Sequence, residues 1–194
     1  MHLNKIKKSR PGETPAWISK KQCGRFLVFI PVLASLMIMN CLKVPLSMTD
    51  KYLQNRIIEN SRKAKIDPFF TEAVIYAESG FKKRARSSSG AQGYMQVNVS
   101  AAVDGLRHSG YLTAASNVIK NPDLLYETDL NILSGTAYFR WILDKKRPTD
   151  WIEWLAYYNS GRPDYVVGEY IIKIKRRYEK NAGKSIEKMY RGIK

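Results

Sequence analysis

Helical periodicity is the sequence feature that most constrains this fold. Apolar residues recur at intervals of three and four through most of residues 44–194, whereas the alternating pattern of strands is scarce. A segment of this length is typical of one domain. The sequence therefore predicts a single, mostly α-helical domain.

Two of the expected helices have well-marked ends. Asp67 is a favoured N-cap residue, Pro68 suits the first helical position, and Gly80 is typical of the residue just past a helix end. Asp150 and Gly161 delimit another helix in the same way. These residues predict where both helices begin and end.

Periodicity predicts three further helices, over residues 50–63, 129–143 and 164–180. The polar, glycine-rich residues 82–96 indicate a loop. The residues expected to face the core are Leu53 and Ile57 in the first helix, Leu130, Leu133, Ala137, Trp141 and Ile142 in the second, and Val166, Val167, Tyr170, Ile174 and Tyr178 in the third.

An uncharged run, residues 26–42, follows a basic N-terminal stretch and ends at Lys43. It is short for a membrane-spanning helix, which needs about 20 apolar residues. It is long for the core of a signal peptide, which has about 7–15 residues. Either form would insert with its basic flank in the cytoplasm and export the residues that follow. A cleaved signal peptide and a retained anchor both remain open.

Composition excludes several classes of protein. The chain has 33 Lys and Arg against 17 Asp and Glu, a formal net charge of +16. It contains no zinc-finger, ribonucleoprotein or basic-zipper motif, so we expect no specific nucleic-acid partner.

Its two cysteines and two histidines exclude a disulfide scaffold and lack the spacing of a metal site. We expect neither a metal nor a cofactor.

Glu78 stands out as a candidate catalytic acid. Phe70, Val74 and Glu78 are four residues apart, so they lie along one stripe of a helix with the core residues. Desolvation and the negative end of the helix dipole would both raise the pKa of this carboxyl. A protonated Glu can donate a proton to a leaving oxygen. The alternative is a side chain that bends into water, as we expect for Glu72 on the polar side of the same helix.

Three motifs occur in order along the chain: ESG at residues 78–80, SSSGAQGYMQ at 87–96 and AYYNSG at 156–161. Asn131-Ile132, Gly135 and Tyr138 precede the third motif at a matching spacing. Together they resemble the signatures of the lytic transglycosylases of the goose-type lysozyme superfamily, over roughly residues 50–178. The resemblance implies a mostly helical, lysozyme-like domain with a substrate cleft.

The resemblance also implies an activity. Members of this family cleave the glycan strand of peptidoglycan between N-acetylmuramic acid and N-acetylglucosamine and form a 1,6-anhydro product. Glu78 matches the catalytic acid, which then serves as the base. The residues matched to, or suited to, substrate binding are Ser87, Tyr94, Gln96, Tyr158, Asn159 and Tyr170, and those expected to support the site structurally are Ser79, Gly90, Gly93 and Gly161.

One position departs from the family pattern. Asn98 stands where the family usually has an apolar contact residue, which puts the details of sugar binding in doubt.

The expected organisation has four parts. Residues 1–25 form a basic flank on the cytoplasmic side, residues 26–43 a signal-peptide core or anchor, residues 44–181 the catalytic domain, and residues 182–194 a basic C-terminal tail. The expected location is the periplasm or cell envelope. The expected partners are peptidoglycan, the membrane if residues 26–42 are retained, and a wall-spanning secretion or conjugation apparatus, with which the short members of the family often work.

Two other functions remain open. A hydrolytic lysozyme would use Glu78 with a second acid, such as Asp104 or Asp164, to orient water. A non-catalytic module that binds the cell wall or nucleic acid would use only its basic surface.

Overall fold

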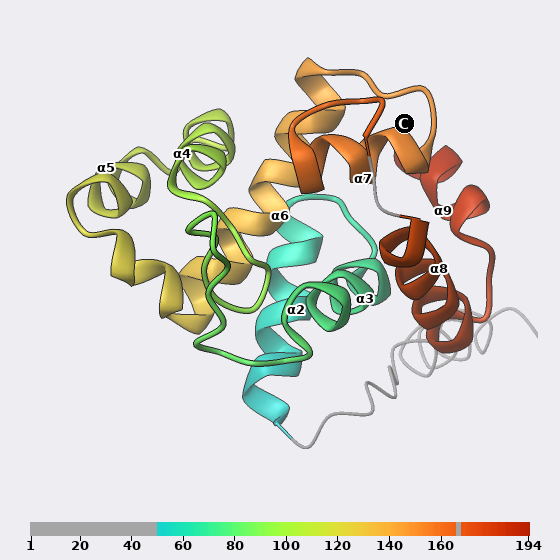
Figure 1. The fold of residues 1–194 in the computed structure, drawn as a ribbon, viewed down its shortest axis with the longest axis horizontal. Helices are drawn as coiled ribbons and strands as arrows, with labels where there is room; N and C mark the ends of the chain where they lie inside the picture. Colours follow the sequence, from blue (N-terminus) through green and yellow to red (C-terminus); the bar gives the residue numbers. More distant parts are fainter. Residues whose placement is uncertain (1–49, 166–167) are drawn as a thin grey trace, which may run out of the picture. The chain divides into compact units, whose positions relative to one another are not determined.

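A computed structural model describes residues 50–165 and 168–194, which are mostly helical and joined by loops (Figure 1). The apolar run 26–42 and the residues Val166 and Val167 lie outside these ranges. In chain order the helices are α2 (Lys51–Lys63), α3 (Pro68–Ser79), α4 (Val99–His108), α5 (Leu112–Lys120), the 3-10 helix η1 (Pro122–Tyr126), α6 (Thr128–Lys145), α7 (Trp151–Ser160), α8 (Gly168–Ala182) and α9 (Ile186–Ile193).

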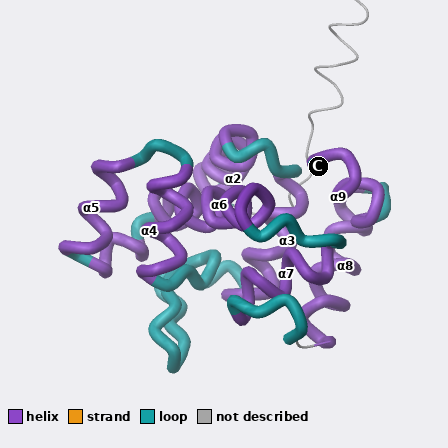
Figure 2. Tube along the Cα trace, turned by 90° about the horizontal axis from the view of Figure 1, so that it is seen from above, coloured by secondary structure: helices purple, strands orange, loops and turns teal. Residues whose placement is uncertain are grey.

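The described part of the chain contains no extended strand, only isolated bridges that tie the loop after α3 to itself at Gln92 (Figure 2). This confirms the expected mostly helical class. None of the helices in residues 50–165 and 168–194 combines the length and apolarity that crossing a membrane requires.

The helix ends that the sequence predicts are confirmed. The Asp67 carboxylate accepts a hydrogen bond from the Phe69 amide at the start of α3, and Gly80 ends that helix in a left-handed conformation. The Asp150 carboxylate caps α7, and Gly161 ends it in the same way as Gly80.

α6 is the helix around which the others are arranged. It packs against α2, α4 and α7, and lies between α4 and α2 in Figure 1. Because neighbours surround α6 on several sides, its buried face is broader than the predicted stripe. Ala137 and Ile142 are buried as expected, but Leu130, Leu133 and Trp141 are only half-buried. The fully buried apolar side chains of this helix are Ile132, Phe139 and Ile142.

Aromatic rings from three helices form the centre of the core. Phe70 of α3 stacks on Trp154 of α7 with ring centroids 4.7 Å apart, and Phe139 of α6 stacks on Tyr158 of α7 at 3.8 Å. The Trp154 indole donates a hydrogen bond of 3.0 Å to the Phe139 carbonyl. These contacts hold α3 and α7, which carry two of the family motifs, against one another.

Two regions differ from the sequence prediction. α4 and α5 lie where no helix was predicted, and neither begins at a residue whose side chain caps the first turn, as Asp67 and Asp150 do for α3 and α7. Residues 182–194, expected to form a basic tail, instead include α9. Its residues Ile186, Met189 and Tyr190 are buried, and the Tyr190 hydroxyl donates a hydrogen bond of 2.6 Å to the Pro148 carbonyl. The apolar face of this short helix therefore continues the core to the end of the chain.

Candidate active site

Glu78 lies in the last turn of α3, on the stripe that the sequence predicts. Phe70 and Val74, two and one turns before it, are fully buried. Glu78 itself is partly buried. The following Ser79 hydroxyl donates a hydrogen bond of 3.1 Å to the Ile75 carbonyl, which stabilises this helix end. The structural role expected for Ser79 fits this contact.

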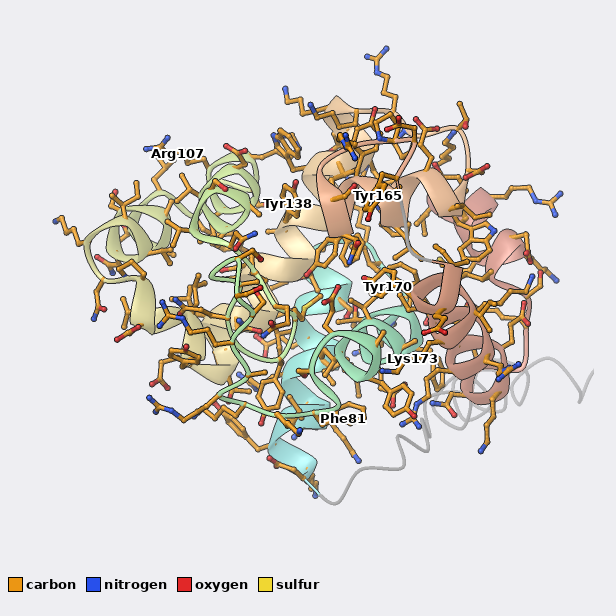
Figure 3. All side chains as sticks on the ribbon, in the orientation of Figure 1. Phe81, Arg107, Tyr138, Tyr165, Tyr170 and Lys173 are labelled. Atoms are coloured by element: carbon orange, nitrogen blue, oxygen red, sulfur yellow. The ribbon has the colours of Figure 1, made fainter. Side chains whose placement is uncertain are left out.

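Tyr170 reaches Glu78 from another helix. It lies in the first turn of α8, and its hydroxyl donates a hydrogen bond of 2.6 Å to Glu78 Oε1. Figure 3 labels Tyr170 and Lys173 where α8 meets α3. The structure therefore brings together two residues that the sequence analysis names and that are 92 positions apart.

Burial raises the pKa of Glu78 to about 7, although the Tyr170 hydroxyl and the Lys173 charge both act to lower it. Burial also raises the pKa of Tyr170 and Tyr158 well above the usual value, and the nearby Glu78 charge raises both further. Both tyrosines are therefore hydrogen-bond donors near neutral pH. Glu78 exists there as a mixture of acid and carboxylate, so it can both give and take a proton.

A cavity of about 470 Å³ adjoins Glu78. Of the residues in ranges 50–165 and 168–194 that line it, Glu78 is the only one with a carboxylate. Asp104 and Asp164 are exposed and do not line this cavity. Its lining residues are Glu78, Ser87, Ser89, Ala91, Gln96, Val97, Asn98, Ser100, Ala101, Tyr138, Tyr158, Asn159, Ser160 and Gly161.

The loop after α3 contributes Ser87 and Gln96 to the cavity. Ser87 Oγ accepts a hydrogen bond of 3.0 Å from the Ala91 amide. The Gln96 side-chain amide donates to the carbonyls of Ala85 and Gly93, at 3.0 and 2.9 Å. Gln96 therefore holds the loop in shape with its NH₂ group while it lines the cavity.

α7 contributes Tyr158 and Asn159. The Tyr158 hydroxyl donates a hydrogen bond of 2.8 Å to the Met95 carbonyl, so it links α7 to the loop after α3. Asn159 is exposed at the cavity, with its side chain available to a ligand. Tyr138 of α6 also lines the cavity; it appears in the sequence only as part of the spacing before the third motif.

Tyr94 differs from expectation. Its side chain is 8% exposed and packs in the hydrophobic core, and it does not line this cavity. A large ring in a loop that crosses the core gains more by burying its apolar surface than by facing solvent. The substrate contact expected of Tyr94 is therefore not supported.

Gly93 has a structural reason to be glycine. Its φ is +77°, and a Cβ there would lie 2.3 Å from Asn131 Nδ2 and 2.6 Å from the Leu125 carbonyl oxygen. The buried Asn131 amide donates to the Gln92 and Leu125 carbonyls and accepts from the Met95 amide. The structural role expected for Gly93 is thus to leave room for Asn131 of α6, which holds the loop in place.

Gly90 and Gly161 also have positive φ angles, +87° in a turn and +75° at a helix end.

Glu72 was expected to face solvent, and this expectation is wrong. The side chain is fully buried, and Arg177 of α8 binds both of its oxygens, with Arg177 Nη2 2.5 Å from Glu72 Oε1. The Asn181 amide donates a further hydrogen bond of 3.0 Å to Glu72. α8 covers the side of α3 that appears polar in the sequence, so Glu72 and Tyr170 both belong to the contact between these helices.

Comparison with known families agrees with this geometry. The model of the transglycosylase SLT domain matches residues 55–183, which include Glu78, the loop after α3, α7 and α8. The chain belongs to the transglycosylase SLT domain family. No curated protein sequence matches it.

The SLT domain also has a structural relative. An inactive mutant of the lytic transglycosylase Slt from Pseudomonas aeruginosa superposes with a TM-score of 0.55 at 17% sequence identity. The match covers 84% of this chain and 29% of that one, so this chain spans less than a third of that protein's length. At this identity the likeness shows a shared fold.

Proposed function

We propose that this SLT domain protein is a peptidoglycan lytic transglycosylase that uses Glu78 first as an acid and then as a base. The observation that most supports this is the isolation of Glu78. It adjoins the cavity, its pKa is raised to about 7, and no second carboxylate lines the cavity within the described part of the chain. The family match is in keeping with this proposal.

The proposed first step is protonation of the leaving group. Protonated Glu78 gives its proton to the glycosidic oxygen between N-acetylmuramic acid and N-acetylglucosamine, and the bond from that oxygen to the muramoyl C1 breaks. The substrate's 2-acetamido group stabilises the positive charge that develops at C1. The Tyr170 hydroxyl, already 2.6 Å from Glu78, then stabilises the carboxylate that remains.

The second step closes a ring. The Glu78 carboxylate removes the proton from the muramoyl 6-hydroxyl, whose oxygen bonds to C1 and forms the 1,6-anhydro product. Glu78 is protonated again and ready for another cycle. No water enters the product, and every proton transfer uses this one side chain.

A hydrolytic lysozyme is the nearest alternative. Glycosidases of that kind pair an acid with a second carboxylate about 5–9.5 Å away. Asp104 and Asp164, the second acids that the sequence offers, do not line the cavity with Glu78. We therefore favour the single-carboxylate reaction.

Mass spectrometry of the products released from isolated sacculi by the full chain tests this proposal. Anhydromuramoyl ends are expected, and reducing ends would show hydrolysis instead. Glu78→Gln is expected to lose at least 100-fold in rate, because general acid–base catalysis contributes about 10²–10⁴-fold. Undiminished turnover by a folded Glu78→Gln protein would contradict the role of Glu78.

We also propose that the protein is exported to the cell envelope, where its substrate lies. The support is the uncharged run 26–42 after a basic flank. The membrane, through residues 26–42, and a wall-spanning secretion or conjugation apparatus are proposed partners. Fractionation of cells and N-terminal sequencing of the mature protein would separate a cleaved signal peptide from a retained anchor.

A further inference from the structure

The outer face of α8 carries three exposed cations. Lys173, Arg176 and Lys180 follow at intervals of three and four, so they share one side of the helix, and all three are exposed. None forms an ion pair with any residue that the structure describes. The other bases of α8 are neutralised: Lys175 Nζ is 2.6 Å from Glu187 Oε1, and Arg177 pairs with Glu72. We call Lys173, Arg176 and Lys180 the α8 basic face.

A surface hollow of about 510 Å³ lies along the α8 basic face. Its apolar contacts come from the Tyr76 ring and from Ile172, whose side chain is 52% exposed. Among the described residues that line the hollow, Glu169 is the one acid, against the three cations of the α8 basic face. The hollow therefore combines a net positive charge with small apolar surfaces, which suits a short anionic peptide.

The α8 basic face begins beside the catalytic acid. Lys173 Nζ donates a hydrogen bond of 3.2 Å to the Ala77 carbonyl, next to Glu78, and lies 4.9 Å from the centre of the Tyr76 ring. From Lys173 to Lys180 is seven residues, which is about 10 Å along a helix. A peptide of three or four residues in extended form spans about 10–14 Å. A peptide attached to a sugar at Glu78 could thus reach all three cations.

We infer that the α8 basic face binds the carboxylates of the peptide stems on the glycan strand, and so favours strands that carry stems over bare glycan. This inference rests on the function proposed above. The cations lie in a row of peptide length that starts at Lys173, whose ammonium contacts the Ala77 carbonyl next to Glu78. An anionic lipid surface would need a broader apolar contact than Ile172 and the Tyr76 ring provide. A nucleic acid would gain nothing from the position of these cations beside the catalytic site. The test below distinguishes peptide stems from both of these alternative partners.

The test compares two substrates with the full chain in detergent: soluble glycan strands with intact stems, and the same strands after an amidase has removed the stems. The variant is Arg176→Gln with Lys180→Gln. The control is Arg107→Gln with Lys120→Gln, which removes the same two charges from exposed residues of α4 and α5; Figure 3 shows Arg107 far from Lys173. Lys173 is left unchanged because it also contacts Ala77 beside Glu78.

The readout is the ratio of kcat/KM for stem-bearing strands to kcat/KM for stem-free strands. The α8 variant should lower this ratio about 3- to 10-fold relative to wild type, as expected for two exposed charge pairs. The loss should appear in KM and should shrink as salt is added, because exposed pairs are screened. The control should keep the wild-type ratio.

Three results would overturn the inference: an unchanged ratio in the α8 variant, an equal change in the control, or a wild-type enzyme indifferent to stems. Loss of binding to phosphatidylglycerol vesicles or to DNA with an unchanged ratio would assign the face to lipid or nucleic acid instead. The proposed function is tested separately, by whether the wild-type protein produces anhydromuramoyl ends on either substrate.

Discussion

The partly exposed Arg177 guanidinium and the fully buried Glu72 carboxylate form an ion pair that joins α8 to α3 across 105 residues of sequence. Seven residues before Arg177 on α8, Tyr170 meets Glu78, which lies six residues after Glu72 on α3. The two helices therefore run antiparallel with two polar contacts between them. A buried charge without its partner is costly, so the ion pair disfavours sliding or rotation of α8 against α3. It thereby helps to hold the Tyr170 hydroxyl on Glu78.

Glu72→Ala should lower the free energy of unfolding by about 1.5–3 kcal/mol, because it removes charge-assisted hydrogen bonds to a guanidinium that is only partly exposed. Urea unfolding followed by circular dichroism measures the loss. Glu59→Ala is the matched control: Glu59 pairs with Arg56 and Lys63 at the surface, so its removal should lower the free energy of unfolding much less than Glu72→Ala does. Equal effects of the two substitutions would show that burial adds nothing to the Glu72 pair.

Tyr170→Phe should move the alkaline limb of the kcat/KM profile to higher pH. The Tyr170 hydroxyl stabilises the Glu78 carboxylate and lowers its pKa, so its removal lets the pKa rise further above about 7. The protonated acid then persists to higher pH, although the rate falls because the carboxylate formed after proton transfer loses a donor. Tyr157→Phe, which alters a tyrosine on α7 that does not line the cavity, should leave the limb in place. A limb that moves to lower pH would contradict this account.

Glu78→Gln should stabilise the fold above neutral pH. The ordinary pKa of Glu is 4.5 and that of folded Glu78 is about 7, so the folded state holds this proton more tightly than the unfolded state. The contribution of Glu78 to the free energy of unfolding of the wild type is therefore fully present below pH 4.5. It is lost as the pH rises through about 7. Gln stays neutral, so at pH 8 the variant should gain about 1–3 kcal/mol over wild type, and at pH 4.5 or below the difference should shrink. Urea titrations at both pH values check this, and a difference independent of pH would argue against the raised pKa.

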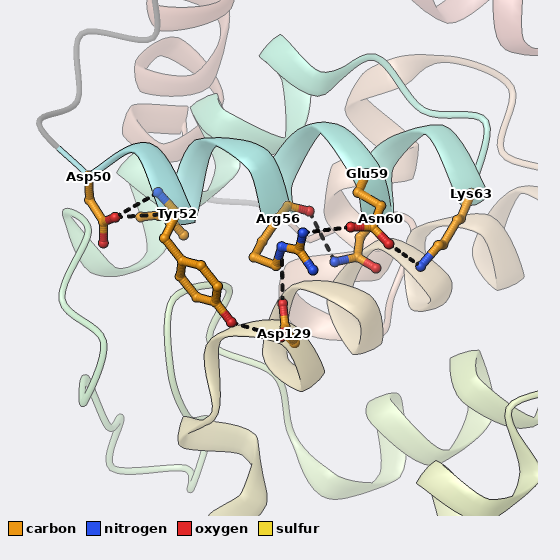
Figure 4. A network of polar contacts seen from close by, with 8 residues as sticks. Asp50, Tyr52, Arg56, Glu59, Asn60, Lys63 and Asp129 are labelled. Carbon is orange, nitrogen blue, oxygen red and sulfur yellow. Dashed lines mark hydrogen bonds and ion pairs between the residues drawn. The ribbon is translucent and has the colours of Figure 1, made fainter.

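Asp50→Ala should lower the free energy of unfolding by about 1 kcal/mol. The Asp50 carboxylate accepts hydrogen bonds from the Tyr52 and Leu53 amides, at 2.9 and 3.3 Å, and so caps α2 (Figure 4). The same end of α2 is tied to α6, since the Tyr52 hydroxyl donates to Asp129 at 2.8 Å. Asp50→Asn keeps a capping oxygen and should retain most of the stability in thermal unfolding. Losses of the same size in both variants would exclude capping as the cause.

The sequence by itself determined the helix ends and the stripe that contains Glu78. Capping at Asp67, Gly80, Asp150 and Gly161 depends on atoms only a few residues away, so local sequence is enough to specify it. The stripe follows from the fixed geometry of a helix. The resemblance to the family likewise pointed to Tyr170, which lies outside the three motifs.

Only the tertiary structure decided which polar and aromatic side chains are buried. Glu72 is buried because Arg177, far along the chain, covers it; Tyr94 turns into the core, and residues 186–190 complete that core instead of forming a tail. Burial depends on which distant element packs against a residue, and a periodic pattern does not specify that element. The composition of the cavity is decided in the same way: among the described residues that line it Glu78 is the only carboxylate, because of where α4, α6 and α7 place their side chains.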